Sequence, residues 1–319
     1  MSHHQTGLSF RFLNQELARL YPYLLGASNG LVLYTTNIYN QIRYYVCNPL
    51  TQKWVSLPPP PPRENNWAVA GLICNQCLSE SSTSYKVIRI PQVKAAAKEF
   101  RVEIYSSDLG EWNVVSCPPR ATWEVTIHDN FVTLNGVLYW FQQQNSEVLA
   151  FSVDRNTNDG TCGNECRLIN IPYLVRDRYD FTSLSECLGE SEGLICFARF
   201  KYKEMSLSVW VLDVDWYVLH QDIQLYDWLA EIETRLCDGS DGRDLMTEIR
   251  IAGFSPVDKN VVILSFKEYV WAYNTKTRVY EQLCHPSFLR SNVPSVPRLR
   301  ALEFILKPRP TTLPPVSWE

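Results

Sequence analysis

The chain has 319 residues, of which 45% are apolar and 20% are charged, and its formal net charge is −4. This composition is typical of a globular protein and excludes a disordered one. The slightly acidic balance, without a basic stripe, argues against nucleic acid as a partner. The absence of an apolar run of about 18 residues argues against a membrane span.

The N-terminal sequence, Met-Ser-His-His-Gln-Thr-Gly, does not have the charged and then apolar layout of a secretory signal. Without such a signal, the 10 cysteines are expected to be reduced thiols. We therefore expect the protein to work in the cytoplasm, the nucleus or both.

A weak repeat runs along most of the chain. Five times an extended segment ends in a turn and restarts on an aromatic or apolar strand. The turn residues recur at intervals of about 50–60 positions, close to the period of a β-propeller blade. They are Asn48, Ser106, Asp154, Asp213 and Asn274. The repeat predicts an all-β fold, a β-propeller platform whose chemistry would lie in its loops.

Strands are expected where short runs rich in Val, Ile, Tyr, Phe and Trp lie between turn formers. The first blade shows three such runs, at 30–34, 43–47 and 54–57. Its fourth strand is expected from 298–305 or 8–13, because a strand from the other end of the chain closes the ring and removes exposed edges. The expected strands of the other blades are 68–74, 85–90, 100–105 and 112–116; 123–127, 136–141, 147–153 and 166–171; 183–188, 193–200, 207–212 and 216–220; and 247–254, 260–266, 269–273 and 279–283.

These runs favour five four-stranded blades, and a partial sixth blade from the two termini stays open. Good helix formers predict short helical insertions at 93–99 and 226–236. Residues 155–165 and 238–244 have the Asn, Asp and Gly content of loops. We expect an N-terminal segment (1–20), one propeller domain (21–306) and a Pro-rich tail (307–319).

Five ordered segments carry a resemblance to a known family. The most diagnostic is Tyr44 to Pro59, Tyr-Tyr-Val-Cys-Asn-Pro-Leu-Thr-Gln-Lys-Trp-Val-Ser-Leu-Pro-Pro. The other segments are 25–32, 85–89, 102–112 and 134–140. In order and approximate spacing they resemble the plant F-box-associated, kelch-like β-propeller domain, over about residues 20–283.

The resemblance implies a non-enzymatic module that recognises a protein substrate for a cullin-type (SCF-type) ubiquitin ligase. Members of the family usually carry an F-box before the propeller, and the F-box docks on the ligase adaptor. Here only some 20 residues precede the first motif, and they show no Leu-Pro-rich helical pattern. Ligase components are therefore expected as indirect partners. The alternative is a scaffold, or a competitor of full-length relatives, without a ligase role.

Two patterns point toward enzymes. Gly26, Ser28 and Gly30 fit the G-x-S-x-G nucleophile pattern, but that motif needs a helix after the turn, and a strand-like run follows here. Residues 106–112 resemble the Asp-box turn of sialidase propellers, one residue short. A glycosidase also needs a placed pair of carboxyl groups, and no pair suggests itself. Both patterns are interpreted as structural turns, so we expect no catalytic residue, and a propeller glycosidase is the weaker alternative.

The sequence also contains possible metal ligands. Two cysteine pairs, 74/77 and 162/166, could be halves of a Cys₄ zinc site, but they lie in different blades and such spacing alone is weak evidence. The acidic loop 238–244 lacks the alternating ligands and final glutamate of a calcium loop. The five histidines form no cluster. We expect no metal and no cofactor.

The connections between blades give the candidate partner-binding residues. They contain prolines, which stiffen a loop and lower the entropy cost of binding, beside the Trp, Tyr and Arg types that are enriched at interface hot spots. The alternative is that the tryptophans pack between blades and the arginines are solvated. The candidates are Arg63, Trp67, Arg120, Trp123, Tyr173, Arg176, Arg178 and Tyr179.

Overall fold

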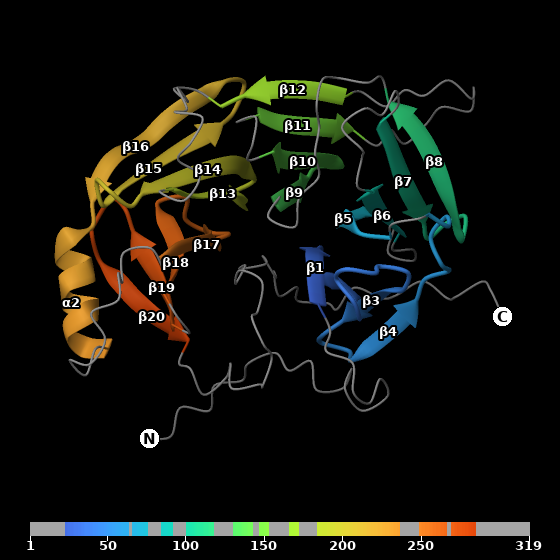
Figure 1. The fold of residues 1–319 in the computed structure, drawn as a ribbon, viewed down its shortest axis with the longest axis horizontal. Helices are drawn as coiled ribbons and strands as arrows, with labels where there is room; N and C mark the ends of the chain where they lie inside the picture. Colours follow the sequence, from blue (N-terminus) through green and yellow to red (C-terminus); the bar gives the residue numbers. More distant parts are fainter. Residues whose placement is uncertain are drawn as a thin grey trace. The chain divides into compact units, whose positions relative to one another are not determined.

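The computed structural model describes residues 23–63, 66–75, 84–91, 100–117, 130–142, 147–152, 166–171, 184–236, 249–266 and 269–284. These residues form five four-stranded antiparallel sheets and one α-helix (Figure 1). In every sheet each strand pairs with the next strand along the chain. The prediction of five four-stranded blades is confirmed, and the described residues form no sixth sheet.

The first sheet consists of β1 (Tyr23–Ser28), β2 (Leu31–Thr35), β3 (Tyr44–Asn48) and β4 (Lys53–Ser56). Asn29 and Gly30 join β1 to β2 with φ angles of 52° and 79°. Two successive positive φ angles are what a tight two-residue hairpin requires. The local hairpin supplies the fourth strand, so the expectation that a chain terminus supplies it was wrong. Residues 8–13 and 298–305 lie outside the described residues.

The second sheet agrees with its predicted strands to within one residue at each end. It consists of β5 (Ala68–Asn75), β6 (Ser84–Pro91), β7 (Phe100–Ser106) and β8 (Glu111–Cys117). The β7–β8 turn is closed by the Gly110 amide, which donates to the Ser106 carbonyl at 2.8 Å, and Gly110 has a φ of 72°. The interpretation of residues 106–112 as a structural turn is therefore confirmed.

The third sheet shows one misplaced strand. It consists of β9 (Asn130–Leu134), β10 (Val137–Gln142), β11 (Glu147–Ser152) and β12 (Cys166–Asn170). The first strand was expected at 123–127, but β10 pairs with 130–134. Asn135 and Gly136, with φ angles of 52° and 81°, form a tight hairpin, which makes the residues directly before them the partner strand.

The last two sheets and the helix follow the prediction closely. The fourth sheet is β13 (Leu184–Ser191), β14 (Leu194–Lys201), β15 (Ser206–Leu212) and β16 (Trp216–Gln224). Helix α2 (Tyr226–Leu236) follows, within the predicted bounds. The fifth sheet is β17 (Arg250–Phe254), β18 (Val261–Phe266), β19 (Tyr269–Asn274) and β20 (Tyr280–Cys284). The predicted helix at 93–99, loops at 155–165 and 238–244, and tail at 307–319 lie outside the described residues.

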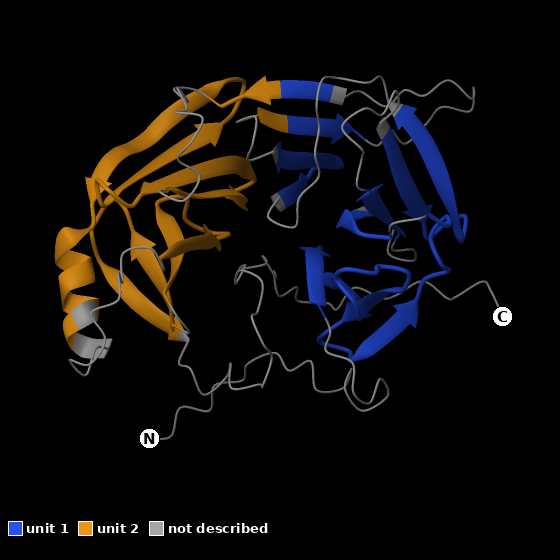
Figure 2. Cartoon of the chain, viewed as in Figure 1, with its two compact units in different colours: residues 1–142, 149–168, 304–319 blue, residues 143–148, 169–303 orange. Residues whose placement is uncertain are grey.

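The chain divides into two compact units (Figure 2). Unit 1 comprises residues 1–142, 149–168 and 304–319, and unit 2 comprises 143–148 and 169–303. The first two sheets and most of the third belong to unit 1. The last two sheets and α2 belong to unit 2. The expectation of one propeller domain over 21–306 stays a prediction.

In unit 1, apolar clusters fill the space between successive sheets. One joins the first and second sheets through residues such as Leu33, Val46 and Val87. Another joins the second and third sheets through residues such as Ile88, Trp140 and Phe151. These side chains are almost completely buried, so each sheet of the unit uses its neighbour to cover an apolar face.

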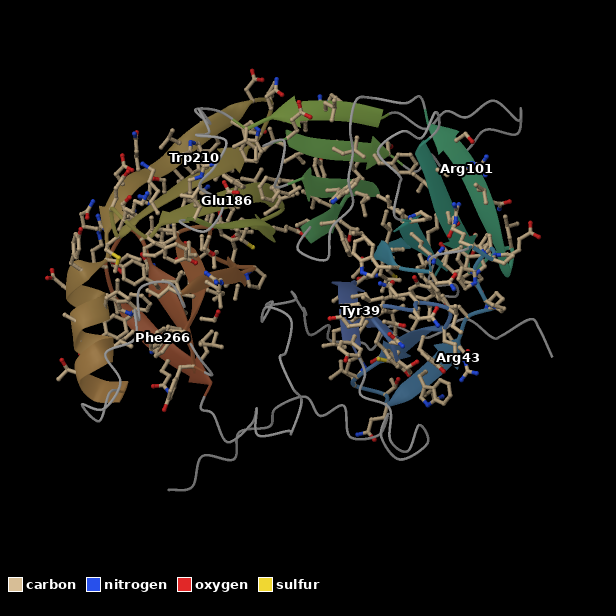
Figure 3. All side chains as sticks on the ribbon, in the orientation of Figure 1. Tyr39, Arg43, Arg101, Glu186, Trp210 and Phe266 are labelled. Carbon is tan, nitrogen blue, oxygen red and sulfur yellow. The ribbon has the colours of Figure 1, made fainter. Side chains whose placement is uncertain are left out.

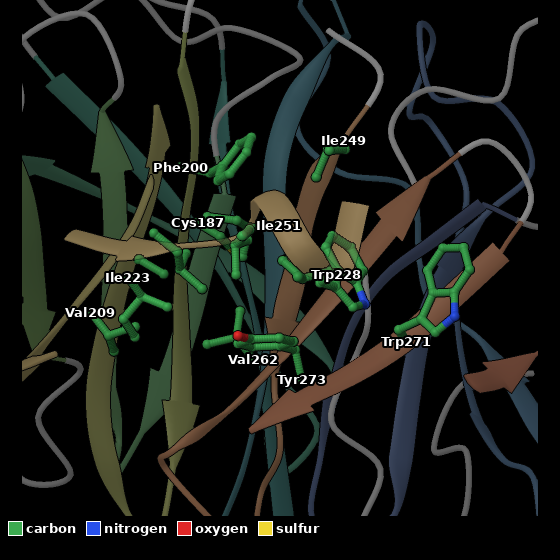
Figure 4. Close-up of a cluster of buried hydrophobic side chains, with 14 of the residues drawn as sticks. Cys187, Phe200, Val209, Ile223, Trp228, Ile249, Ile251, Val262, Trp271 and Tyr273 are labelled. Carbon is green, nitrogen blue, oxygen red and sulfur yellow. The ribbon is translucent and has the colours of Figure 1, made fainter. Parts of the chain in front are cut away.

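In unit 2, one large cluster joins the fourth and fifth sheets and α2 (Figure 4). Trp228 and Ile232 lie four positions apart on α2, so they share the helix face that is buried. The Trp228 ring meets the rings of Trp271 and Tyr273 nearly edge-on, with centroids 5.9 Å apart in both pairs. Edge-to-face geometry is the favourable arrangement for aromatic pairs.

Candidate interaction surface

Two loops of unit 1 leave the same end of the first sheet. In an up-and-down sheet the β2–β3 loop and the chain that follows β4 emerge together, and the β1–β2 and β3–β4 turns lie at the opposite end. We call residues 36–43 of the β2–β3 loop and residues 57–63, 66 and 67 of the β4–β5 connection the loop face of unit 1. Binding residues are concentrated on loops that a rigid sheet holds in position.

Gln41 joins the two loops. Its backbone amide donates to the Asn66 carbonyl at 3.2 Å. Its side-chain Nε2 donates to the carbonyls of Ile38 at 3.0 Å and Ala68 at 2.7 Å. Gln41 is buried, so these bonds are shielded from water. The β2–β3 loop is therefore fixed to the connection between the first two sheets.

The β2–β3 loop is also ordered from within. Asn37 Oδ1 accepts hydrogen bonds from the Tyr39 and Asn40 amides at 2.9 and 3.0 Å, which is an Asx turn. At the base of the loop, the Thr35 hydroxyl donates to the Arg43 carbonyl at 2.9 Å. These bonds fix the backbone of the loop before any partner arrives, which lowers the entropy cost of binding.

A buried ionic cluster supports the loop face from below. Arg89 on β6 and Glu103 on β7 are cross-strand partners, and neither side chain is exposed. Arg89 Nη1 donates to one carboxylate oxygen of Glu103, and Arg63 Nε donates to the other. Two guanidinium groups thus share one carboxylate. Because a buried charge without a partner is costly, each member holds the others in place.

The cluster extends to Gln41 through Tyr44. Arg89 Nε donates to the Tyr44 hydroxyl at 3.0 Å, and that hydroxyl donates to Gln41 Oε1 at 2.8 Å. Arg89 Nη2 donates to the Asn66 carbonyl at 2.8 Å. Burial raises the pKa of Tyr44, although the nearby Arg89 opposes the shift. Tyr44 therefore stays protonated and keeps its role as donor to Gln41.

Three side chains project from this supported loop. Tyr39 is 65% exposed and Ile42 is 42% exposed, both large values for such apolar side chains. Arg43 is exposed as well. Figure 3 shows the Tyr39 and Arg43 side chains on unit 1. Within the described residues, no ion pair or hydrogen bond engages the side chains of these three residues.

Two of the sequence candidates lie in the described part of the connection, and both have structural contacts. The Arg63 side chain is 26% exposed and pairs with Glu103. Trp67 is 7% exposed and packs in the cluster between the second and third sheets. The burial of Trp67 agrees with the alternative that it packs between blades. A partner role for either residue stays a prediction.

The other six candidates cannot be placed, because they lie outside the described residues. They are Arg120, Trp123, Tyr173, Arg176, Arg178 and Tyr179. The structure instead exposes the side chains of Tyr39, Ile42 and Arg43, which were not among the candidates. The available signal was the alternation of Asn with Tyr and Ile in Thr-Asn-Ile-Tyr-Asn-Gln-Ile-Arg, which is typical of an Asx-turn loop with exposed apolar side chains.

A comparison with known protein families identifies the family of the chain. Residues 6–285 match the family model described as F-box protein At3g26010-like, beta-propeller. The chain belongs to this family. The predicted resemblance to plant F-box-associated propellers is thereby confirmed, and the five four-stranded sheets are the blades of a β-propeller.

Individual relatives of the chain are also named as F-box proteins. F-box protein At3g26010 of Arabidopsis thaliana is 30% identical over 200 residues, which cover 60% of this chain and 44% of that protein. A second Arabidopsis thaliana relative, At3g23950, is 29% identical over 187 residues, which cover 54% of this chain and 42% of that protein. The chain thus matches less than half the length of these relatives.

Solved structures are more distant. A structure of the fission yeast SREBP-SCAP binding domains has a TM-score of 0.39 and 10% identity, over 91% of this chain and 72% of that one. A luciferin-regenerating enzyme has a TM-score of 0.38 and 8% identity, over 84% of this chain and 78% of that one. Similarities this low say nothing about what an F-box propeller binds.

The enzyme-like G-x-S-x-G pattern has a structural explanation in this family member. Ser28 ends β1, the Asn29-Gly30 turn follows, and β2 begins at Leu31. The Ser28 hydroxyl accepts a hydrogen bond from the Cys74 amide of β5 at 3.0 Å. A nucleophile elbow needs a strand, a turn and then a helix, so the hairpin interpretation is confirmed.

Among the residues that the structure describes, no group of three or more His, Cys, Asp and Glu side chains could hold a metal ion. His220 Nε2 forms a hydrogen bond with Asn260 Oδ1 at 2.9 Å. Among the described residues, no helix is long and apolar enough to cross a bilayer.

Proposed function

We propose that this propeller is a protein-interaction module that recruits a target protein for ubiquitination by a cullin-type ubiquitin ligase. The observation that carries the proposal is the match of residues 6–285 to an F-box protein β-propeller family. The proposal is for a binding role without chemistry on the target. The ligase contact would be made by an F-box, on this polypeptide or on a bridging partner.

The loop face of unit 1 supports a binding role. Its two loops are cross-linked through Gln41 and rest on the buried Arg89–Glu103 pair. A preformed loop loses little conformational entropy on binding, so more of the contact energy appears as affinity. Tyr and Arg, two of the three residue types most enriched at binding hot spots, lie exposed on it at Tyr39 and Arg43.

We also propose that the module acts in the cytoplasm or the nucleus. Two described cysteines, Cys47 and Cys196, are free thiols. Free thiols are the usual state in reducing compartments. A fluorescent fusion expressed in plant cells tests this proposal, and a signal confined to the secretory pathway would contradict it.

The test of the function is an affinity purification of the tagged chain from plant extract, read by mass spectrometry. We expect a reproducible protein partner together with the cullin adaptor. A partner without the adaptor would keep the interaction module and remove the ligase role, as a scaffold or competitor would behave. The absence of both would overturn the proposal.

A further inference from the structure

We propose that the β2–β3 loop of unit 1 is the epitope that takes an acidic segment of a partner protein, with an apolar side chain beside its carboxylates. This inference rests on the proposed function and specifies where and what the module binds. The residues assigned to the contact are Tyr39, Ile42 and Arg43.

The first support is that two apolar side chains of the loop are exposed and do not hold the loop in place. Tyr39 and Ile42 expose 65% and 42% of their surface, while their loop neighbour Gln41 is buried and makes four hydrogen bonds. Gln41 therefore fixes the loop, and the two apolar side chains beside it are left in solvent. When a partner covers large apolar side chains on a fixed loop, the burial of their surface stabilises the complex.

The second support is charge. Among the described residues of the loop face, the charged side chains are Arg43 and Arg63, and both are cationic. Arg63 forms an ion pair with Glu103, whereas Arg43 is exposed and makes no ion pair within the described residues. Glu64 follows Arg63 in the sequence but lies outside the described residues. A guanidinium with all its donors available fits a carboxylate in a two-bond geometry.

The third support is the spacing of the contacts. Tyr39 and Arg43 are four positions apart, so their Cα atoms lie no more than about 14 Å from each other. An extended peptide of about five residues reaches that far. One short segment with an apolar residue and an acidic residue within about five positions can therefore contact both Tyr39 and Arg43.

The loop is also held against collapse onto the protein. Asn37 Oδ1 accepts from the Tyr39 and Asn40 amides, and Thr35 donates to the Arg43 carbonyl. The backbone on both sides of Ile42 is thus bonded, at Gln41 and at Arg43. The side chains can change rotamer on binding, but the loop that carries them does not need to refold.

The experiment uses the full chain and three displayed pools of peptides of about ten residues. In the acidic pool, Leu or Phe lies within five positions of two Asp or Glu residues. In the second pool Lys replaces the acidic residues, and in the third Ser replaces them. Enriched peptides are then synthesised with a fluorophore, and their affinities are measured by fluorescence anisotropy at low and high salt.

Four variants locate the contact. Arg43→Glu and Tyr39→Ala change the epitope. Lys53→Glu is the matched charge control, because Lys53 is exposed and begins β4 at the opposite end of the same sheet. Leu109→Ala is the matched apolar control, since Leu109 is 64% exposed on the β7–β8 turn. Circular dichroism and thermal melts establish that all four variants are folded.

We expect enrichment from the acidic pool alone, with affinity that falls as salt rises. Arg43→Glu and Tyr39→Ala should each weaken binding about tenfold or more, and the two controls less than about twofold. Enrichment independent of acidic residues would overturn the inference, as would acidic peptides that bind the epitope variants normally. If the purified chain captures its partner regardless of the Arg43 and Tyr39 changes, this epitope falls and the proposed function stands.

Discussion

At the scale of single residues, the buried charge cluster of unit 1 is expected to be sensitive to substitution. Arg89 and Arg63 share the Glu103 carboxylate. A buried cation that loses its partner cannot recover its hydration, so the loss exceeds the strength of an ordinary hydrogen bond. The same cluster orders Tyr44 and Gln41, so its effect reaches the loop face.

Glu103→Gln is therefore expected to lower the free energy of unfolding by about 3–5 kcal/mol. The change keeps the side-chain shape, removes the charge and replaces one of the two acceptor oxygens with an NH₂ donor. Denaturant unfolding followed by tryptophan fluorescence gives the value. Glu111→Gln on β8 is the matched control, because Glu111 is exposed and should change stability by less than about 0.5 kcal/mol. Equal effects of the two substitutions would show that the cluster is not buried as described.

Two buried thiols give a pH dependence with a definite sign. Burial raises the pKa of the Cys47 and Cys196 thiols to about 12. In the unfolded chain a thiol ionises near pH 8.5. Above that pH the unfolded state loses protons that the folded state keeps, so stability falls as pH rises from about 8.5 toward 12.

The double variant Cys47→Ala and Cys196→Ala should therefore have a flatter stability curve at alkaline pH than the parent. Alanine removes the titrating groups, although it also lowers stability at every pH by leaving small cavities. Denaturant midpoints at a series of alkaline pH values give the two slopes. Parallel curves for parent and variant would contradict the assignment of these thiols as buried and protonated.

At the scale of elements, the first strands of neighbouring sheets within each unit meet through glycine and phenylalanine. In unit 1, a Cβ on Gly71 of β5 would overlap the ring of Phe131 on β9. In unit 2, a Cβ on Gly189 of β13 would overlap the ring of Phe254 on β17. The same contact recurs in both units, so it is a feature of how one blade packs on the next.

Gly71→Ala is expected to destabilise the chain by about 1–3 kcal/mol, because the added methyl group overpacks the strand against Phe131. Gly26→Ala on β1 is the matched control. A Cβ at Gly26 would meet its nearest atom, the Leu72 backbone nitrogen, at an ordinary 3.5 Å. Thermal and denaturant unfolding of both variants provide the comparison. If Gly26→Ala costs as much as Gly71→Ala, the packing of Phe131 is not the cause.

Elements were predictable from sequence wherever the local signal was strong. Helix α2 lies within its predicted bounds, and the second sheet differs from prediction by single residues. The two misplaced strands share one cause. Strands were expected to begin at Gly30 and Gly136, but the residues just before each Asn-Gly pair were not assigned as the partner strand. A two-residue turn leaves no other choice of partner.

The candidate surface was harder to predict than the fold. Residue type identified Arg63 and Trp67 as binding candidates, but type alone could not show that Glu103 pairs with the first and the core takes up the second. Conversely, Arg43 was assigned to a strand, and β3 begins only at Tyr44. Exposure depends on long-range contacts such as Gln41 with Ala68, which no local pattern encodes.

At the scale of the whole molecule, the chain is an F-box family propeller, and we propose that its fixed loops bind a protein partner. The family match covers residues 6–285 and the relatives are matched over less than half their length. The two compact units each have their own apolar core, which gives the loops a rigid support. Under the proposed function, the role of the molecule depends on what its loops bind.

The most direct test is a parallel purification of the parent chain, Arg43→Glu and Lys53→Glu from plant extract, with quantitative mass spectrometry. We expect the parent and Lys53→Glu to retain the same protein partner together with the cullin adaptor, and Arg43→Glu to lose the partner. A parent chain that retains neither a reproducible partner nor any ligase component would contradict the account.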